Sequence, residues 1–344
     1  MGLTIQVKFD ETSTSFTAQR LRIAGDSERV RFSALPEVAQ ILRVPAKAFY
    51  ANGPGDGERK RAFLSNAPIW GLEDMATIYY AKGIAVDGTR FCLRFIFNAS
   101  QAIRDPESNN YQIYSRLLQD AKFSSQDLSS SAGVLTPIHF GLWLMKTEDW
   151  AGNVIFSLTQ WCGISWKSLM RTKYNTLQNR ALVGRTFEAF HDMGFKLVKS
   201  DSFDSWHLQQ ILLDIEDPHL TENARLNGNA RCFIAGFSDA VEHCCKRKVP
   251  VLPIGCLLPR NTFGCEELRS LSLHLGFTKT PTDPPDFALK AVEWYECYRQ
   301  QHTNYASSSL LMAQRKRMFP RPVACLRRLG NLARRRRGFW FDLG

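Results

Sequence analysis

The sequence predicts an α+β protein in two parts, a small antiparallel β-sheet with one helix followed by a mainly helical part. Short apolar runs separated by turn residues fill positions 62–100, which is typical of strands joined by hairpins. Apolar residues then recur at helical spacing at 111–120 and again at 177–193. The 344 residues suffice for one large or two medium cores.

Residues 1–58 are interpreted as an N-terminal extension of unknown role. The strings LTIQVKF and ERVRFSAL alternate as strands do, and a short helix is expected around Pro36 to Leu42. The string NGPGDGERKR at 52–61 is dense in glycine and charge, as exposed turns are. It therefore marks the first boundary.

The sheet and its helix are expected within residues 59–145. The β-like runs are AFLSNAPIW, ATIYYAKGIAV and TRFCLRFIF, and Asp87-Gly88 supplies a hairpin turn between the last two. The string YQIYSRLLQD follows, with Ile113 and Leu117 at helical spacing. This part is therefore a small sheet backed by one helix.

The mainly helical part is expected over residues 146–312. A helix at 177–193 would place Val183, Phe187 and Phe190 on one face. The apolar runs at 210–213 and 232–235 are separated by a polar loop, which predicts a hairpin over the helical core.

The net charge of +11 is concentrated at one end of the chain. Residues 313–344 hold ten Lys and Arg residues against one acid, so nine of the eleven net charges lie in this segment. The rest of the chain is close to neutral, which argues against a nucleic-acid-binding surface on the folded body. The segment is expected to be a flexible tail.

The tail suggests particular partners. Its two basic clusters are separated by 16 residues, as in a bipartite nuclear-import signal, and the second is a run of four arginines. Leu326, Leu329 and Ala333 also permit a basic amphipathic helix. Nucleic acid or an anionic membrane would bind through 313–344, and a solvated tail without a partner is the alternative.

Cysteine usage and the N-terminal residues suggest a reducing compartment. No charged head followed by an apolar run begins the sequence, so an intracellular protein, nuclear or cytoplasmic and without a transmembrane segment, is expected. The nine cysteines include no CxxC pair, which weakens the case for a zinc framework. No metal site is predicted. Structural roles are expected for His243, Cys244, Cys245, Cys232, Cys256 and Cys265.

Several strings occur in the order of the protein-kinase fold. GVLTPIHFG is similar to the strand before the kinase hinge, NVIFSLTQWCG to the hinge, and FEAFHDMGF to the helix that leads to the catalytic loop. CFIAGFSDAVEHCC and FGCEEL resemble segments of a divergent group of fungal kinase-like proteins. The resemblance spans residues 62–280 and implies a two-lobed protein-kinase-like fold, with a sheet-rich N-lobe and a mainly helical C-lobe.

The resemblance also implies that the residues which hold nucleotide and magnesium are replaced. Gly71 alone remains of the three glycines that would cover the phosphates, and Arg94 replaces the ATP-binding lysine. Gly236 stands where an Asp would precede Phe237 and bind magnesium, and Asp239 is the nearest carboxylate. The cofactor implied is ATP, with or without Mg, held weakly if at all.

The catalytic loop is aligned with FDSWHLQQILL. Asp204 would be the base, with Asp201 as the alternative, and Gln209 would replace the metal-binding Asn. Tyr111 or Gln112 occupies the position of the glutamate that would pair with the lysine, so the arginine is expected to lack this ionic partner.

The expected function is that of a pseudokinase that acts as a scaffold or regulator of a protein partner. Each degraded motif normally stabilises the transition state, and every ~1.4 kcal/mol lost slows a reaction tenfold. One alternative is an active, atypical ATP-dependent protein kinase that uses Asp204 with Arg94. The other is a nucleic-acid-associated protein recruited through its arginine-rich tail.

Overall fold

The structure of the chain is a computed structural model. It describes residues 3–9, 15–22, 32–45, 49–50, 79–96, 109–147, 152–198, 203–205, 207–253 and 260–277. The predictions for Gly71, Asp201, Cys256 and the tail at 313–344 lie outside these residues.

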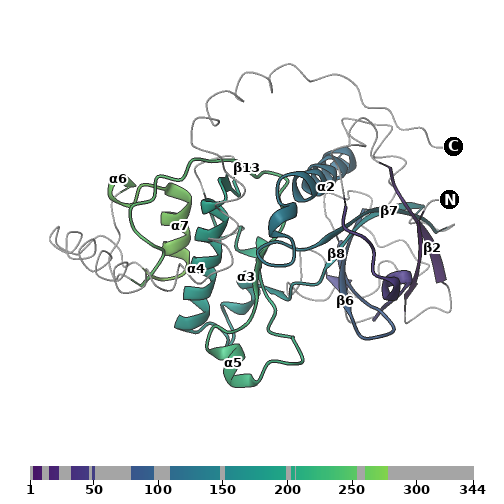
Figure 1. Cartoon of the computed structure of the whole chain (residues 1–344), viewed down its shortest axis with the longest axis horizontal. Coiled ribbons are helices and arrows are strands. Elements are labelled where there is room, and N and C mark those ends of the chain that lie inside the picture. Colours follow the sequence, from purple (N-terminus) through teal and green to yellow (C-terminus); the bar gives the residue numbers. More distant parts are fainter. Residues whose placement is uncertain are drawn as a thin grey trace, which may run out of the picture.

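Seven strands close into a β-barrel, which lies on the right of Figure 1. Their order is β3-β1-β2-β7-β8-β6-β5, and pairing of β5 with β3, where Ile84 lies opposite Arg43, completes the ring. Strands β1 and β3 are parallel and the other neighbours antiparallel, so the barrel is mixed. The strands are β1 (Thr4–Phe9), β2 (Ser15–Arg20), β3 (Ile41–Val44), β5 (Tyr79–Ile84), β6 (Arg90–Ile96), β7 (His139–Lys146) and β8 (Asn153–Gln160), and β4 (Phe49–Tyr50) pairs with β5.

Alternate residues of these strands fill the barrel interior. In β1, Ile5, Val7 and Phe9 are buried while the residues between them are more exposed, as period-two alternation requires. The interior also holds Trp143 and Phe156. Burial of one such large side chain stabilises a fold by about 1.5–3 kcal/mol, so this core holds the strands of the ring together.

Helix α2 (Asn109–Gln126) covers the outside of the barrel (Figure 1). Its residues Ile113 and Leu117 pack with Leu142 of β7 and Ile155 of β8. These two strand residues precede the interior residues Trp143 and Phe156, so they point to the opposite face of the sheet. The apolar stripe of α2 thus buries the outer face of β7 and β8.

A second core joins the remaining elements, with α4, α6 and α7 on the left of Figure 1. Helix α4 contributes Val183, Phe187 and Phe190 to it, and the hydroxyl oxygen of Thr176 caps this helix by accepting from the Asn179 amide. The helices are α3 (Trp166–Leu169), α4 (Leu177–Asp192), α5 (Glu222–Leu226), α6 (Arg260–Phe263) and α7 (Glu266–His274), with 3-10 turns η1 (Glu37–Gln40), η3 (Ser129–Ser131) and η4 (His207–Gln210). The strands are β9 (Ile164–Ser165), β11 (Ile211–Leu213) and β12 (Cys232–Ile234), which form one sheet, and the pair β10 (Phe195–Lys196) and β13 (Val241–Glu242).

The predicted two-lobed protein-kinase-like fold, with an antiparallel N-lobe sheet and a mainly helical C-lobe, is wrong. The sheet is a closed mixed barrel, and three of its strands come from residues 4–44, which the sequence suggests to be an extension. The described residues contain six α-helices, four of which have nine residues or fewer. Local periodicity predicts strands but not their partners, so it does not reveal that β1 and β3 close the ring.

None of the helices within the described ranges combines the length and the apolar character that crossing a membrane requires.

Candidate functional site

A cavity of about 450 Å³ lies where the barrel, helix α2 and the three-stranded sheet meet. The barrel lines it with Tyr80 and Arg94, α2 with Asp120, and the other side with Gln210 and Phe237. This volume is typical of sites for small organic molecules, which combine apolar walls with a few polar groups. The cavity is therefore the candidate functional site.

A buried ion pair spans one wall of the cavity. The guanidinium of Arg94 on β6 donates to Asp120 Oδ2 on α2 and, through Nε, to Ser157 Oγ at 2.9 Å. The other carboxylate oxygen, Asp120 Oδ1, accepts from the backbone amide of Phe237. The expectation that Arg94 lacks an ionic partner is wrong. Asp120, further along the same helix than Tyr111 and Gln112, forms the ion pair with Arg94.

Burial and this ion pair set the charges of the wall. Burial alone would lower the pKa of Arg94, but the Asp120 carboxylate, together with Tyr80 and Cys92, raises the pKa on balance, so the guanidinium stays charged. Burial raises the pKa of Tyr80 and raises that of Cys92 to about 11. Both groups are therefore neutral at physiological pH.

The imidazole of His139, at the start of β7, is a neutral hydrogen-bonding group in the cavity wall. Its Nδ1 accepts from the Gly141 amide at 3.1 Å, which places the ring proton on Nε2. Nε2 is buried and has no hydrogen-bond partner among the described residues. Burial lowers the pKa of His139 to about 3, so the ring remains neutral and Nε2 is an available donor.

Gln210 supplies an acceptor on the opposite side. Its Nε2 donates to the Gly236 carbonyl at 2.7 Å, and within the described ranges its Oε1 is buried without a partner. Gly236 has φ +77°, and a Cβ there would lie 3.1 Å from the Gln210 amide nitrogen. The glycine thus permits both the left-handed turn and the close approach of this side chain.

Five of the eight residues that the sequence singles out line this one cavity. They are Arg94, Gln209, Gly236, Phe237 and Asp239. Asp204 is exposed and does not line the cavity itself, but its Oδ1 lies 2.9 Å from Nδ1 of His207, which does. Gly71 and Asp201 lie outside the described residues.

Sequence reasoning missed Asp120, His139 and Gln210. The sequence did carry a signal for Asp120. Ile113, Leu117 and Asp120 follow helical spacing and share the buried face of α2. A carboxylate on an apolar helix face is a candidate for a buried pair. The other two depend on packing between distant segments and carry no local signal.

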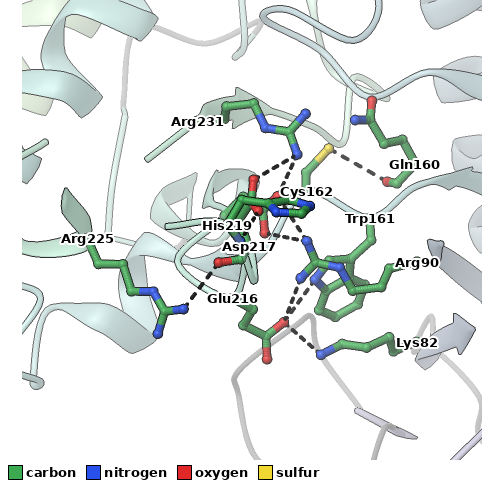
Figure 2. A network of polar contacts seen from close by, with 11 residues as sticks. Lys82, Arg90, Gln160, Trp161, Cys162, Glu216, Asp217, His219, Arg225 and Arg231 are labelled. Carbon is green, nitrogen blue, oxygen red and sulfur yellow. Dashed lines mark hydrogen bonds and ion pairs between the residues drawn. The ribbon is translucent and has the colours of Figure 1, made fainter. Parts of the chain in front are cut away.

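A separate polar network beside the cavity ties the barrel to the three-stranded sheet, and Figure 2 shows its basic side chains converging on acidic ones. Asp214, which follows β11 and is fully buried, accepts from Arg90 of β6 at 3.2 Å and from Arg231 at 2.8 Å. Glu216 accepts from Lys82 at 2.7 Å and from the Trp161 indole at 3.0 Å. These contacts hold two walls of the cavity in place.

No protein-family model matches the sequence, and no curated protein matches it. The closed barrel contradicts the resemblance to a divergent fungal protein-kinase-like family. Neither comparison supplies a relative that would support that resemblance. That family assignment is wrong, and the descriptions as a kinase or pseudokinase are wrong with it.

Proposed function

We propose that this protein is a non-catalytic binding protein with a scaffold or regulatory role, and that its cavity holds a small, neutral, planar molecule of nucleoside type. The observation that carries the proposal is the pairing of the buried Arg94 with Asp120, since it leaves the cavity without a net charge.

Charge argues for a neutral ligand. The charged side chains that line the cavity are Arg94, Arg116, Asp120 and Asp239, whose charges cancel. A nucleoside triphosphate brings several negative charges, which this lining would not compensate. Magnesium needs six oxygen ligands, but both Asp120 oxygens are engaged, so Asp239 is the one carboxylate of the lining left to bind it. A neutral molecule needs neither compensation of phosphate charge nor a bound magnesium ion.

Shape and hydrogen bonding argue for a planar, polar ligand. Tyr80 contributes partly exposed aromatic surface to the cavity, against which a flat ring can stack. His139 offers a donor and Gln210 an acceptor, both without a partner among the described residues. Buried polar groups need hydrogen bonds, so a ligand that supplies both partners gains affinity and specificity.

The same lining disfavours catalysis. Burial raises the pKa of Cys92 to about 11, so its thiol is protonated and a weak nucleophile. Burial lowers the pKa of His139 to about 3, too far from neutrality for an efficient general base. The role that remains is binding, with the ligand stabilising the junction between the barrel and the helices for a protein partner.

Calorimetric titration of the full chain with adenosine, and separately with ATP plus Mg²⁺, tests the proposal. Adenosine is expected to bind and to raise the unfolding temperature, because a ligand that binds only the folded state stabilises it. His139→Phe keeps an aromatic ring but removes the donor, so it should weaken adenosine binding about fivefold, as expected for one neutral hydrogen bond.

His219→Phe is the matched control, because this histidine is exposed and does not line the cavity. Its adenosine affinity should equal that of the parent chain. Absence of adenosine binding would refute the nucleoside class. Magnesium-dependent binding of ATP that is tighter than that of adenosine, or phosphate transfer from ATP, would refute the non-catalytic role.

A further inference from the structure

A second cluster of reactive side chains lies in the helical region, apart from the residues that line the cavity. It contains His191 near the end of α4, His243 just after β13, Cys245 in the loop that follows, and Cys265 immediately before α7. Each offers one ligand atom, and these four atoms all lie within 4.8 Å of one another. Segments far apart in the chain thus bring two imidazoles and two thiols to one point.

The spacing of the cluster fits a tetrahedral metal site. Cys265 Sγ lies 3.7 Å from His191 Nδ1 and 3.6 Å from His243 Nε2. Zinc bonds of about 2.3 Å to sulfur and 2.0–2.1 Å to nitrogen place S and N ligands about 3.5 Å apart at a tetrahedral angle. The two rings are nearly perpendicular, with an interplanar angle of 85°, so each presents a nitrogen from its own direction.

A buried carboxylate orients one of the imidazoles. His191 Nε2 lies 2.9 Å from Glu267 Oε2, and both side chains are buried. Glu267 Oε1 is held in turn by the amides of Leu197 and Val198, at 3.0 and 3.1 Å. A carboxylate at this distance favours the ring proton on Nε2 by charge and leaves the Nδ1 lone pair for the cluster, as an orienting carboxylate does behind a zinc-bound histidine.

The backbone builds the cluster through close contacts. The His243 amide donates to the Gly194 carbonyl at 2.7 Å, next to the pairing of β13 with β10, which brings His243 to the end of α4. Gly264 has φ +84°, and a Cβ there would lie 2.0 Å from the Lys246 carbonyl oxygen. Only glycine allows the chains to approach this closely, and the approach sets Cys265 beside Cys245.

Cys265 lies at the start of helix α7 and offers its sulfur to the cluster. It is the N-cap of α7, yet its side chain makes no capping hydrogen bond, so the sulfur is available to the cluster. The positive end of a helix dipole stabilises negative charge at this position.

We infer that His191, His243, Cys245 and Cys265 form a structural zinc site. The ligand set of two thiolates and two neutral imidazoles is typical of zinc, and four protein ligands leave no open position for substrate. Bound zinc would fasten the end of α4, the loop at 243–245 and the start of α7 to one another. The inference is independent of the ligand proposed for the cavity.

Metal analysis of the full chain, purified without chelator, tests the site. The parent protein is expected to carry about one zinc per chain, and Cys245→Ser and Cys265→Ser to carry less than about a tenth of that, since each loses a ligand. Cys244→Ser is the matched control, because Cys244 is the exposed neighbour of Cys245 and does not belong to the cluster. It should retain the zinc of the parent.

Cobalt substitution keeps the test decisive if a serine variant fails to fold. After chelator treatment of the parent chain, added Co²⁺ should give the visible absorption of a tetrahedral thiolate site, and zinc should displace it. Glu267→Gln should weaken zinc binding about 10–100-fold, as expected for loss of an orienting carboxylate. A parent chain without zinc and without a cobalt spectrum, a disulfide between Cys245 and Cys265, or metal loss in Cys244→Ser would each overturn the inference.

Discussion

The chemistry of single residues in this protein is set by burial more than by residue type. His139 would be partly protonated in water near neutral pH, but burial in β7 lowers its pKa to about 3. Its ring stacks on Phe32 with centroids 5.1 Å apart, and its Nδ1 accepts a backbone hydrogen bond. The residue therefore acts as a neutral donor in the cavity rather than as a titrating group.

Acid should destabilise the fold through His139. The unfolded chain binds a proton at this residue below about pH 6.5, whereas the folded chain does so only near pH 3, so stability is complete above 6.5 and is lost as the pH falls. One such proton corresponds to about 2 kcal/mol between pH 6.5 and 5. Urea unfolding of the parent and of His139→Phe at both pH values measures this, and an equal pH dependence in the two proteins would contradict it.

At the scale of elements, one glycine determines how the barrel continues into the helical region. Gly163 joins the segment after β8 to β9 with φ +94°, and β9 pairs with β11 through Ile164 and Leu213. A Cβ on Gly163 would lie 2.0 Å from the Leu213 carbonyl oxygen. The connection is therefore backbone against backbone, with no room for a side chain.

Gly163→Ala should reduce the free energy of unfolding by about 3 kcal/mol or more, because it combines a positive φ with a clash against backbone. Gly88→Ala is the control, since Gly88 also has positive φ, +86°, but has no atom within 4 Å of the added Cβ. That change should cost only about 1 kcal/mol. Denaturant unfolding of the three proteins would reveal the difference, and equal losses would exclude the backbone contact.

At the scale of the whole molecule, the buried Asp214 couples the barrel to the three-stranded sheet. It pairs with Arg90 from the barrel and with Arg231 from the segment before β12. The carboxylate is fully buried, and its removal leaves the mostly buried Arg90 and the half-exposed Arg231 without this partner. The two regions should then lose cooperativity.

Asp214→Ala should destabilise the protein by about 1.5–3 kcal/mol, as expected when hydrogen bonds between charged groups are removed. Lys82→Met, in the same network but paired with the more exposed Glu216, should cost no more than about 1 kcal/mol. Unfolding followed by tryptophan fluorescence and circular dichroism tests the coupling. The two probes should separate in Asp214→Ala, and coincident transitions with a loss below that of Lys82→Met would refute it.

Much of the local structure follows from the sequence. The runs ATIYYAKGIAV and TRFCLRFIF contain β5 and β6, the predicted helix at 177–193 is α4, and the predicted hairpin is the pair of β11 and β12. These predictions are confirmed because period-two and helical patterns record which side chains each segment buries. The same patterns do not state which segments pair, so the kinase-like arrangement drawn from them is wrong.

The sequence by itself determined where several elements form, among them β5, β6 and α4, and that nine of the eleven net charges lie in the last 32 residues. The tertiary structure alone decided that β1 to β3 close a barrel, that Asp120 neutralises Arg94, and that two histidines and two cysteines meet. Periodicity reports burial within one segment. Closure, ion pairing and metal-ligand geometry depend on contacts between segments tens of residues apart, which local pattern does not encode.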